Sequence, residues 1–193
     1  MKNNKPSLLH QRTINLNGFL IEDDLYQLEA ELLDTKNYDV PNYDRGNINA
    51  GDPIHKMKIV LTVDKEFYIK KAKATTFFSP FKACNRANNN FKMLEGIQIK
   101  HGWRKNVNEI IGNVNGCTHI RELLNSLATV AFQTIHGHNS KKDRDDKKEN
   151  KSRKYQKNNK EQNSKKPSLL SSCFAFRPNS EVVKRLWPEW YKE

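Results

Sequence analysis

The chain has 193 residues, a formal net charge of +12 and 36% hydrophobic residues, which favours one domain with tails over several domains. The positive charge is concentrated in residues 137–166, with twelve Lys or Arg, five Asp or Glu, and Tyr155 as the single large apolar residue. No apolar run approaches the ~18 residues that a membrane span needs, and no secretory leader is visible. Three widely spaced cysteines argue against a disulfide scaffold. We therefore expect a cytoplasmic protein without a membrane partner.

Four segments in the first half of the chain alternate apolar and polar residues, as half-buried strands do. A turn at Asp23-Asp24 and a hairpin turn at 64–66 separate neighbouring strands, and residues 37–53 form a loop rich in Asn, Asp, Pro and Gly. The pattern predicts an antiparallel meander with one buried face. Its strands are expected at 13–21, 26–32, 56–63 and 67–75.

Apolar residues then recur at helical spacing, first in a helix that Ser79 caps and Gly96 ends. A shorter helix starts near Trp103, and the strongest apolar stripe runs from Ile120 to Ile135 and ends at Gly137. Ser180 can cap a last short helix. Strands followed by helices predict an α+β fold with the helices on one face of the sheet.

The domain organisation follows from composition. We expect a flexible N-terminus (1–11), an α+β core domain (12–136), a disordered Lys/Asn-rich insertion (137–166) and a C-terminal segment that packs on the core (167–193). The insertion has almost no apolar area to bury, so nothing offsets the entropy of ordering it.

The residues best suited to chemistry are a thiol and an imidazole, Cys117 and His119, where the strongest helix begins. Free N–H groups and the helix dipole favour the thiolate there. With His55 at the head of a strand and Cys84 near the start of the first predicted helix, they form a two-Cys, two-His set that suits zinc or non-haem iron. The spacing matches no short zinc motif, so their convergence depends on the fold. Cys84 could equally be a buried small hydrophobe.

Two carboxylates could orient an imidazole or act as a base, Asp34 at the end of the second strand and Asp52 just before His55. Each could also simply cap a turn. We predict catalytic roles for Cys117, His119 and Asp52, and expect Arg12 to be a surface or supporting residue.

The order of several short motifs resembles the bacterial family catalogued as "domain of unknown function 2889". They include Pro53-Ile54-His55, Gly116-Cys117-Thr118-His119 and Trp187-Pro188-Glu189-Trp190-Tyr191. The resemblance covers residues 12–136 and 167–191, and it implies no activity. Residues 138–166 look like an insertion relative to the family.

From Gly51 onward, the chain also resembles the iron–sulfur assembly scaffolds of the IscU type. The resemblance implies an IscU-like fold with His55, Cys84 and Cys117 with His119 near the ligand positions. The sequence departs from the scaffolds in having His55 in place of a cysteine and the Cys/His order reversed.

Three kinds of function stay open. The first is a small protein whose Cys/His/Asp cleft binds a metal or small molecule, with lyase- or isomerase-type chemistry if it is an enzyme. The second is a metal or cluster carrier or accessory module with a protein partner. The third and weakest is a nucleic-acid-associated protein acting through the basic tract, which has no aromatic interleaving apart from Tyr155.

Overall fold

The computed structural model describes residues 5–150, 166–167 and 169–193. It contains two compact units, Met1–Arg144 and Asp145–Glu193. The α+β class predicted from the sequence is confirmed.

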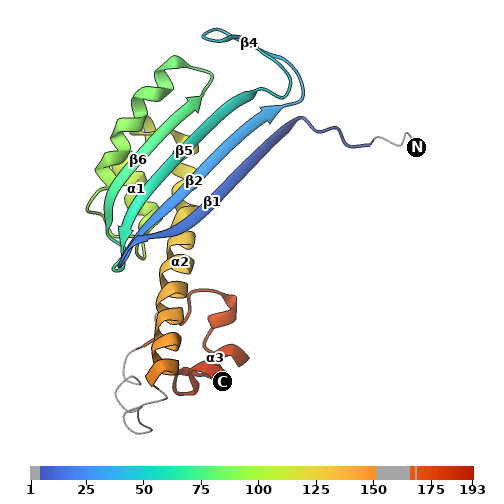
Figure 1. The fold of residues 1–193 in the computed structure, drawn as a ribbon. Coiled ribbons are helices and arrows are strands. Elements are labelled where there is room, and N and C mark those ends of the chain that lie inside the picture. The colour runs from blue at the N-terminus through green and yellow to red at the C-terminus, as the bar shows by residue number, and fades with distance from the viewer. Residues whose placement is uncertain (1–4, 151–165, 168) are drawn as a thin grey trace. The chain divides into compact units, whose positions relative to one another are not determined.

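The first unit is built on a four-stranded antiparallel sheet with the order β1-β2-β5-β6 (Figure 1). The short strands β3 and β4 form a separate two-stranded ribbon in the connection between β2 and β5. The predicted meander is therefore confirmed, with each strand somewhat longer than its pattern indicated. The strands are β1 (His10–Glu22), β2 (Leu25–Lys36), β3 (Val40–Asn42), β4 (Gly46–Ile48), β5 (Pro53–Asp64) and β6 (Ile69–Phe78).

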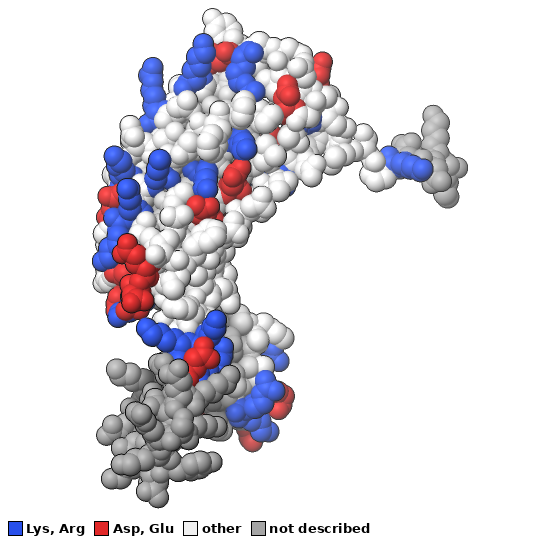
Figure 2. All heavy atoms as spheres, in the orientation of Figure 1, with Lys and Arg blue, Asp and Glu red and all other residues white. Residues whose placement is uncertain are grey.

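The two faces of the sheet differ because side chains alternate along each strand. On β2, Tyr26, Leu28, Ala30 and Leu32 are fully buried. The opposite face carries charged side chains, such as Lys58, whose Nζ lies 2.8 Å from a Glu29 carboxylate oxygen. Figure 2 shows this outer face with basic and acidic side chains interspersed.

Helices cover the apolar face and close the core. They are η1 (Lys82–Leu94, a 3₁₀ helix), α1 (Trp103–Ile111), the 3₁₀ turn η2 (Asn113–Asn115) and α2 (Thr118–Asn150). Figure 1 shows α1 and the start of α2 behind the sheet. The Trp103 indole is buried and donates a hydrogen bond to the Leu124 carbonyl, which ties α1 to α2.

The first helix differs from the prediction at its start. It begins at Lys82, with Phe81 as the capping residue and no side-chain cap, while the Ser79 hydroxyl donates to the Phe81 carbonyl instead. Ser79 lies two residues before the capping position, so the predicted cap does not form.

The long helix α2 also differs, because it runs through Gly137 to Asn150. One helical glycine costs only about 1 kcal/mol relative to alanine, and the residues after Gly137 are mostly charged helix formers. The Tyr26 hydroxyl also lies 2.9 Å from His138 Nδ1, which holds the helix beyond the glycine against β2. Residues 137–150 of the predicted insertion are thus helical, whereas 151–165 lie outside the described residues.

The second unit contains the short elements η4 (Phe174–Phe176), α3 (Glu181–Leu186) and η5 (Pro188–Trp190). Ser180 caps α3 as predicted, because its hydroxyl accepts a hydrogen bond from the Val183 N–H at 3.1 Å. That residues 167–193 pack on the core remains a prediction.

Candidate metal centre

A polar row crosses the buried face of the sheet at one end. Arg12 on β1 is directly opposite Asp34 on β2, and Asp34 is directly opposite His55 on β5. Directly opposed residues of antiparallel strands project on the same side of the sheet. In the next row along the same face, the two central positions are occupied by the buried apolar residues Leu32 and Met57. The polar row therefore lies where the hydrophobic core ends.

Asp34 is the central group of this row. Its carboxylate is 2% exposed and accepts two hydrogen bonds from Arg12, Nε to Oδ1 and Nη2 to Oδ2, both 2.7 Å long. Burial alone would raise the pKa of Asp34, but the Arg12 hydrogen bond and charge outweigh it and hold the pKa below its usual value. The pKa of Arg12 is raised by the same hydrogen bond. Asp34 is therefore an ionised carboxylate, as the buried pairing with a guanidinium requires.

Two histidines lie against this carboxylate. His55 Nδ1 lies 3.1 Å from Asp34 Oδ2, and His119 Nε2, at the start of α2, lies 3.9 Å from the same oxygen. The two imidazole ring centroids are 3.8 Å apart. His10 on β1 approaches from the other side, with its Nε2 3.4 Å from Asp34 Oδ1.

Both histidines favour the neutral form. Burial lowers the pKa of His55, and the neighbouring His119 lowers it further, although Asp34 opposes the shift. Burial and the charge of Arg12 lower the pKa of His119. A neutral imidazole has the free lone pair that binds a metal or accepts a proton.

Cys117 directly precedes α2, as predicted, and its carbonyl accepts the Arg121 N–H. Its Sγ lies 3.9 Å from His119 Nδ1 and 3.6 Å from the sulfur of Met57. The thiol is thus half-buried between the candidate site and the core.

Among the described residues, one group of three or more metal-binding side chains is close enough to share an ion. One ligand atom from each of Asp34, His55 and His119 lies within 4.8 Å of the others. The structure therefore unites the two predicted histidines with Asp34, in place of the predicted two-Cys, two-His set.

Cys84 and Asp52 do not belong to this group. Cys84 is half-buried in the first turn of η1, where its N–H donates to the Phe81 carbonyl. Asp52 is exposed, and its Oδ2 accepts hydrogen bonds from the backbone and side-chain nitrogens of Asn49. Asp52 therefore closes a turn, the other role weighed for it from the sequence.

The importance of Arg12 was missed from the sequence, and Asp34 was given less weight than Asp52. One signal was available for Asp34, because it continues the buried alternation of Tyr26, Leu28, Ala30 and Leu32 by one step. A carboxylate at a predicted core position needs a partner. The pairing register that brings Arg12 opposite it is not visible in the alternation of β1, which is exposed along most of its length.

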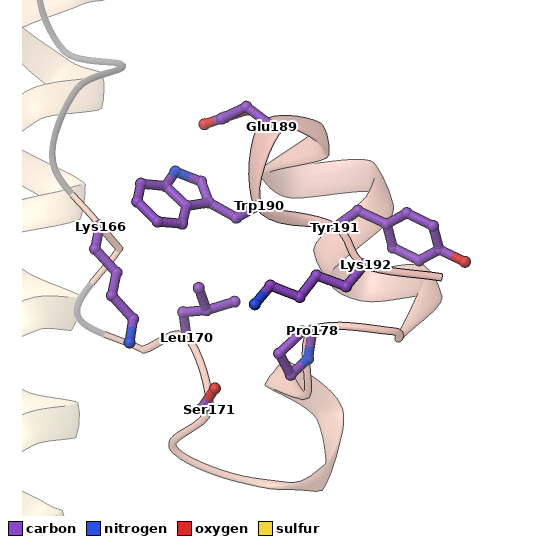
Figure 3. Close-up of a pocket in the computed structure, with 8 residues that line it drawn as sticks. All are labelled: Lys166, Leu170, Ser171, Pro178, Glu189, Trp190, Tyr191 and Lys192. Carbon is purple, nitrogen blue, oxygen red and sulfur yellow. The ribbon is translucent and has the colours of Figure 1, made fainter.

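The described residues form several hollows, two of which differ in their relation to this site. One of about 310 Å³ is bordered by His10 and Lys36 at the same end of the sheet as Asp34. The other, about 360 Å³, lies in the second unit, where Lys166 and Lys192 point towards the space beside Leu170 (Figure 3). It contains none of the predicted site residues.

The family described as Protein of unknown function (DUF2889) matches residues 10–133. The chain belongs to this family. The match to DUF2889 includes every residue of the candidate centre, from Arg12 to His119, as well as the whole sheet. No curated protein and no solved structure matches the chain significantly, so the likeness to iron–sulfur scaffolds remains a prediction. Within the described residues, no helix is long and apolar enough to cross a bilayer.

Proposed function

We propose that this DUF2889 chain binds one divalent transition-metal ion through Asp34, His55 and His119 and uses it to bind a small molecule. The observation that carries the proposal is the approach of one ligand atom from each residue to within 4.8 Å of the others. Two bonds of about 2.0–2.2 Å to one ion span at most about 4.4 Å. The separations of Asp34 Oδ2 from His55 Nδ1, 3.1 Å, and from His119 Nε2, 3.9 Å, lie inside this limit, so one ion is within reach of the three residues.

The donor set suits zinc or non-haem iron. Two imidazoles and a carboxylate are used by catalytic zinc sites and by non-haem iron centres, and three protein ligands leave coordination positions open. Such an ion polarises a carbonyl or lowers the pKa of a bound water. This chemistry serves a lyase or isomerase, the reaction classes that we favour if the protein is an enzyme.

The surrounding residues hold the ligands in place. Arg12 fixes the orientation of the Asp34 carboxylate through its two hydrogen bonds. Each carboxylate oxygen has two lone pairs, so an oxygen that accepts one Arg12 N–H can still bind a metal. The adjacent rings of His55 and His119, tilted by 31° to each other, come from a strand and a helix of one unit, which makes the site rigid.

A second candidate function is thiol chemistry without a metal. Cys117 Sγ, the His119 ring and Asp34 Oδ2 lie in the order of a nucleophile, a base and an orienting carboxylate, with both separations 3.9 Å. These distances exceed the hydrogen-bond reach of about 2.6–3.2 Å for an assembled triad. We therefore rank this function below metal binding.

A metal carrier is the non-catalytic alternative. It has the same ligands but releases the ion to a protein partner, whereas an enzyme keeps its ion through many turnovers. The open coordination positions fit both, and the rate of metal release to a chelator separates them.

Metal titration of protein purified without a histidine tag tests the proposal. We expect the metal-free chain to bind one Zn²⁺, and His55→Ala and His119→Ala to weaken binding by more than about tenfold. The exposed His101 provides the matched control, and His101→Ala and Cys84→Ser should bind zinc like wild type. Equal zinc affinity in all of these variants would overturn the proposal.

A further inference from the structure

We propose that the metal centre takes an oxyanion ligand, a small molecule with a carboxylate or phosphate group, and that Arg12 binds this group beside the ion. The inference deepens the proposed function and rests on it. Four features support it: the unused donors of Arg12, its exposure, the charge of the site with a metal bound, and the neighbouring hollow.

The first step concerns the unused donors of Arg12. A guanidinium has five N–H donors in one plane. The side-on pair, Nε and one hydrogen of Nη2, is used by Asp34. The end-on edge, formed by Nη1 and the second hydrogen of Nη2, points away from Asp34 because the fork is rigid. Arg12 can therefore hold Asp34 and a second oxyanion at the same time.

The second step concerns exposure. The Asp34 side chain is 2% exposed, whereas that of Arg12 is 37% exposed. Arg12 lies on β1, which pairs on one side with β2 and is the edge strand of the sheet. The carboxylate end of the pair is thus enclosed, and the guanidinium end is open to a ligand.

The third step is the charge of the loaded site. Imidazole ligands are neutral when they bind a metal. A divalent ion and Arg12 together bring three positive charges, and the carboxylates that face them are Asp34 and the exposed Glu122 on α2. The site therefore keeps an excess positive charge that an anion on the open coordination positions would neutralise.

The fourth step is the space beside the row. The hollow of about 310 Å³ at this end of the sheet is bordered by His10 and Lys36. His10 lies at the border of both the hollow and the centre, because its Nε2 lies 3.4 Å from Asp34 Oδ1. The cationic lysine at the rim attracts an anion electrostatically.

The test uses the full chain loaded with Co²⁺, whose visible absorption reports changes in coordination. Inorganic phosphate and acetate are titrated separately, so that the two arms distinguish the source of the oxyanion. We expect at least one of them to shift the spectrum of the wild-type protein. Arg12→Lys should weaken the binding of that anion by about tenfold, because lysine keeps the charge but lacks the planar guanidinium.

Arg104→Lys, on the exposed side of α1, is the matched control and should titrate like wild type. Co²⁺ affinity is measured for each protein first. If Co²⁺ does not bind, the proposed function and the inference both fail. If Co²⁺ binds but neither anion shifts the spectrum, or if Arg12→Lys binds the anion as tightly as wild type, only the inference fails. Equally tight anion binding to the metal-free protein would also overturn it.

Discussion

The imidazole ring of His55 on β5 lies with its centroid 3.8 Å from that of His119 on α2. A strand start and a helix start thus meet at the end of the core, and each ring has a nitrogen within 3.9 Å of Asp34 Oδ2. The stability and the chemistry of the candidate centre are therefore linked, because the groups that would bind a metal also hold β2, β5 and α2 together.

The first prediction concerns the Arg12–Asp34 pair. Arg12→Gln leaves the buried Asp34 carboxylate without its cation, and Asp34→Asn removes the charge that pairs with Arg12, so each should destabilise the protein. In a double-mutant cycle, we expect a coupling free energy of about 1–3 kcal/mol, reduced from the value for a fully buried pair because Arg12 is partly exposed. Urea unfolding of wild type, the two single variants and the double variant measures this coupling free energy. Simple additivity of the two single effects would contradict the role given to the pair.

The second prediction concerns the close approach of β1 and α2. A Cβ added at Gly18 would overlap the Thr134 side chain, so Gly18→Ala should lower the unfolding free energy by about 1–3 kcal/mol. Gly137 is the control, because a Cβ there has open space. Gly137→Ala should raise the stability by roughly 0.5–1 kcal/mol, as an added helical alanine does. Thermal unfolding of both variants checks the contrast in sign.

The third prediction is a pH dependence at the hairpin between β5 and β6. Burial alone would raise the pKa of Asp64, but hydrogen bonds from Lys70 and the Tyr68 N–H outweigh it and lower the pKa below its usual value. A depressed carboxyl pKa stabilises the folded state above the unfolded pKa, near 3.9. That stability is lost as the pH falls through the folded value.

Urea unfolding of wild type and Asp64→Asn as a function of pH measures this effect. The stability gap between the two should be constant near neutral pH and narrow as the pH falls below about 4. Glu109→Gln, which breaks an exposed pair with Lys105, is the control and should show a much smaller gap. If the stability difference between wild type and Asp64→Asn widened in acid, the predicted direction of the Asp64 effect would be wrong.

The fourth prediction separates the cysteines. Cys117 borders His119, whereas Cys173 is exposed and Cys84 lies in η1. Saturating Zn²⁺ should slow iodoacetamide alkylation of Cys117, because the occupied site restricts access to the thiol. Peptide mass spectrometry gives the three rates in one experiment. Cys84 and Cys173 serve as internal controls, and an unchanged Cys117 rate would place the ion away from this corner.

The fifth prediction concerns the Lys/Asn-rich insertion. Replacing residues 145–165 with a short Gly/Ser linker should leave the melting temperature of the first unit within a few degrees of wild type. The replaced residues begin where the first unit ends, and Tyr155 is their one large apolar residue, so little burial is lost. The contact of Tyr26 with His138 is retained. A large fall in melting temperature would show that the tract is structural.

The sequence by itself determined the main sheet and the main helix of the first unit, although the short strands β3 and β4 lie where it predicted a loop. The alternation from Tyr26 to Leu32 and from Met57 to Val63 predicted a sheet with one buried face, and the stripe from Ile120 to Ile135 predicted its main helix. These patterns follow from the side-chain periods of strands and helices, so they can be recognised without knowing the tertiary structure.

The end of α2 could not be read in the same way. Gly137 is a favourable stop, yet the helix continues because charged helix formers follow it and Tyr26 meets His138. The weak tendency of glycine to end a helix is outweighed here by a contact between residues that are distant in the chain.

The candidate centre was decided by the tertiary structure. His55 and His119 were identified from their residue types and positions, but their partner among the carboxylates depends on strand register. A shift of one residue between β2 and β5 would turn Asp34 to the outer face. The observed register instead places Arg12, Asp34 and His55 in one row, and packing of α2 on that row adds His119. The residues of the centre are present in the sequence, but only strand pairing and helix packing bring them together.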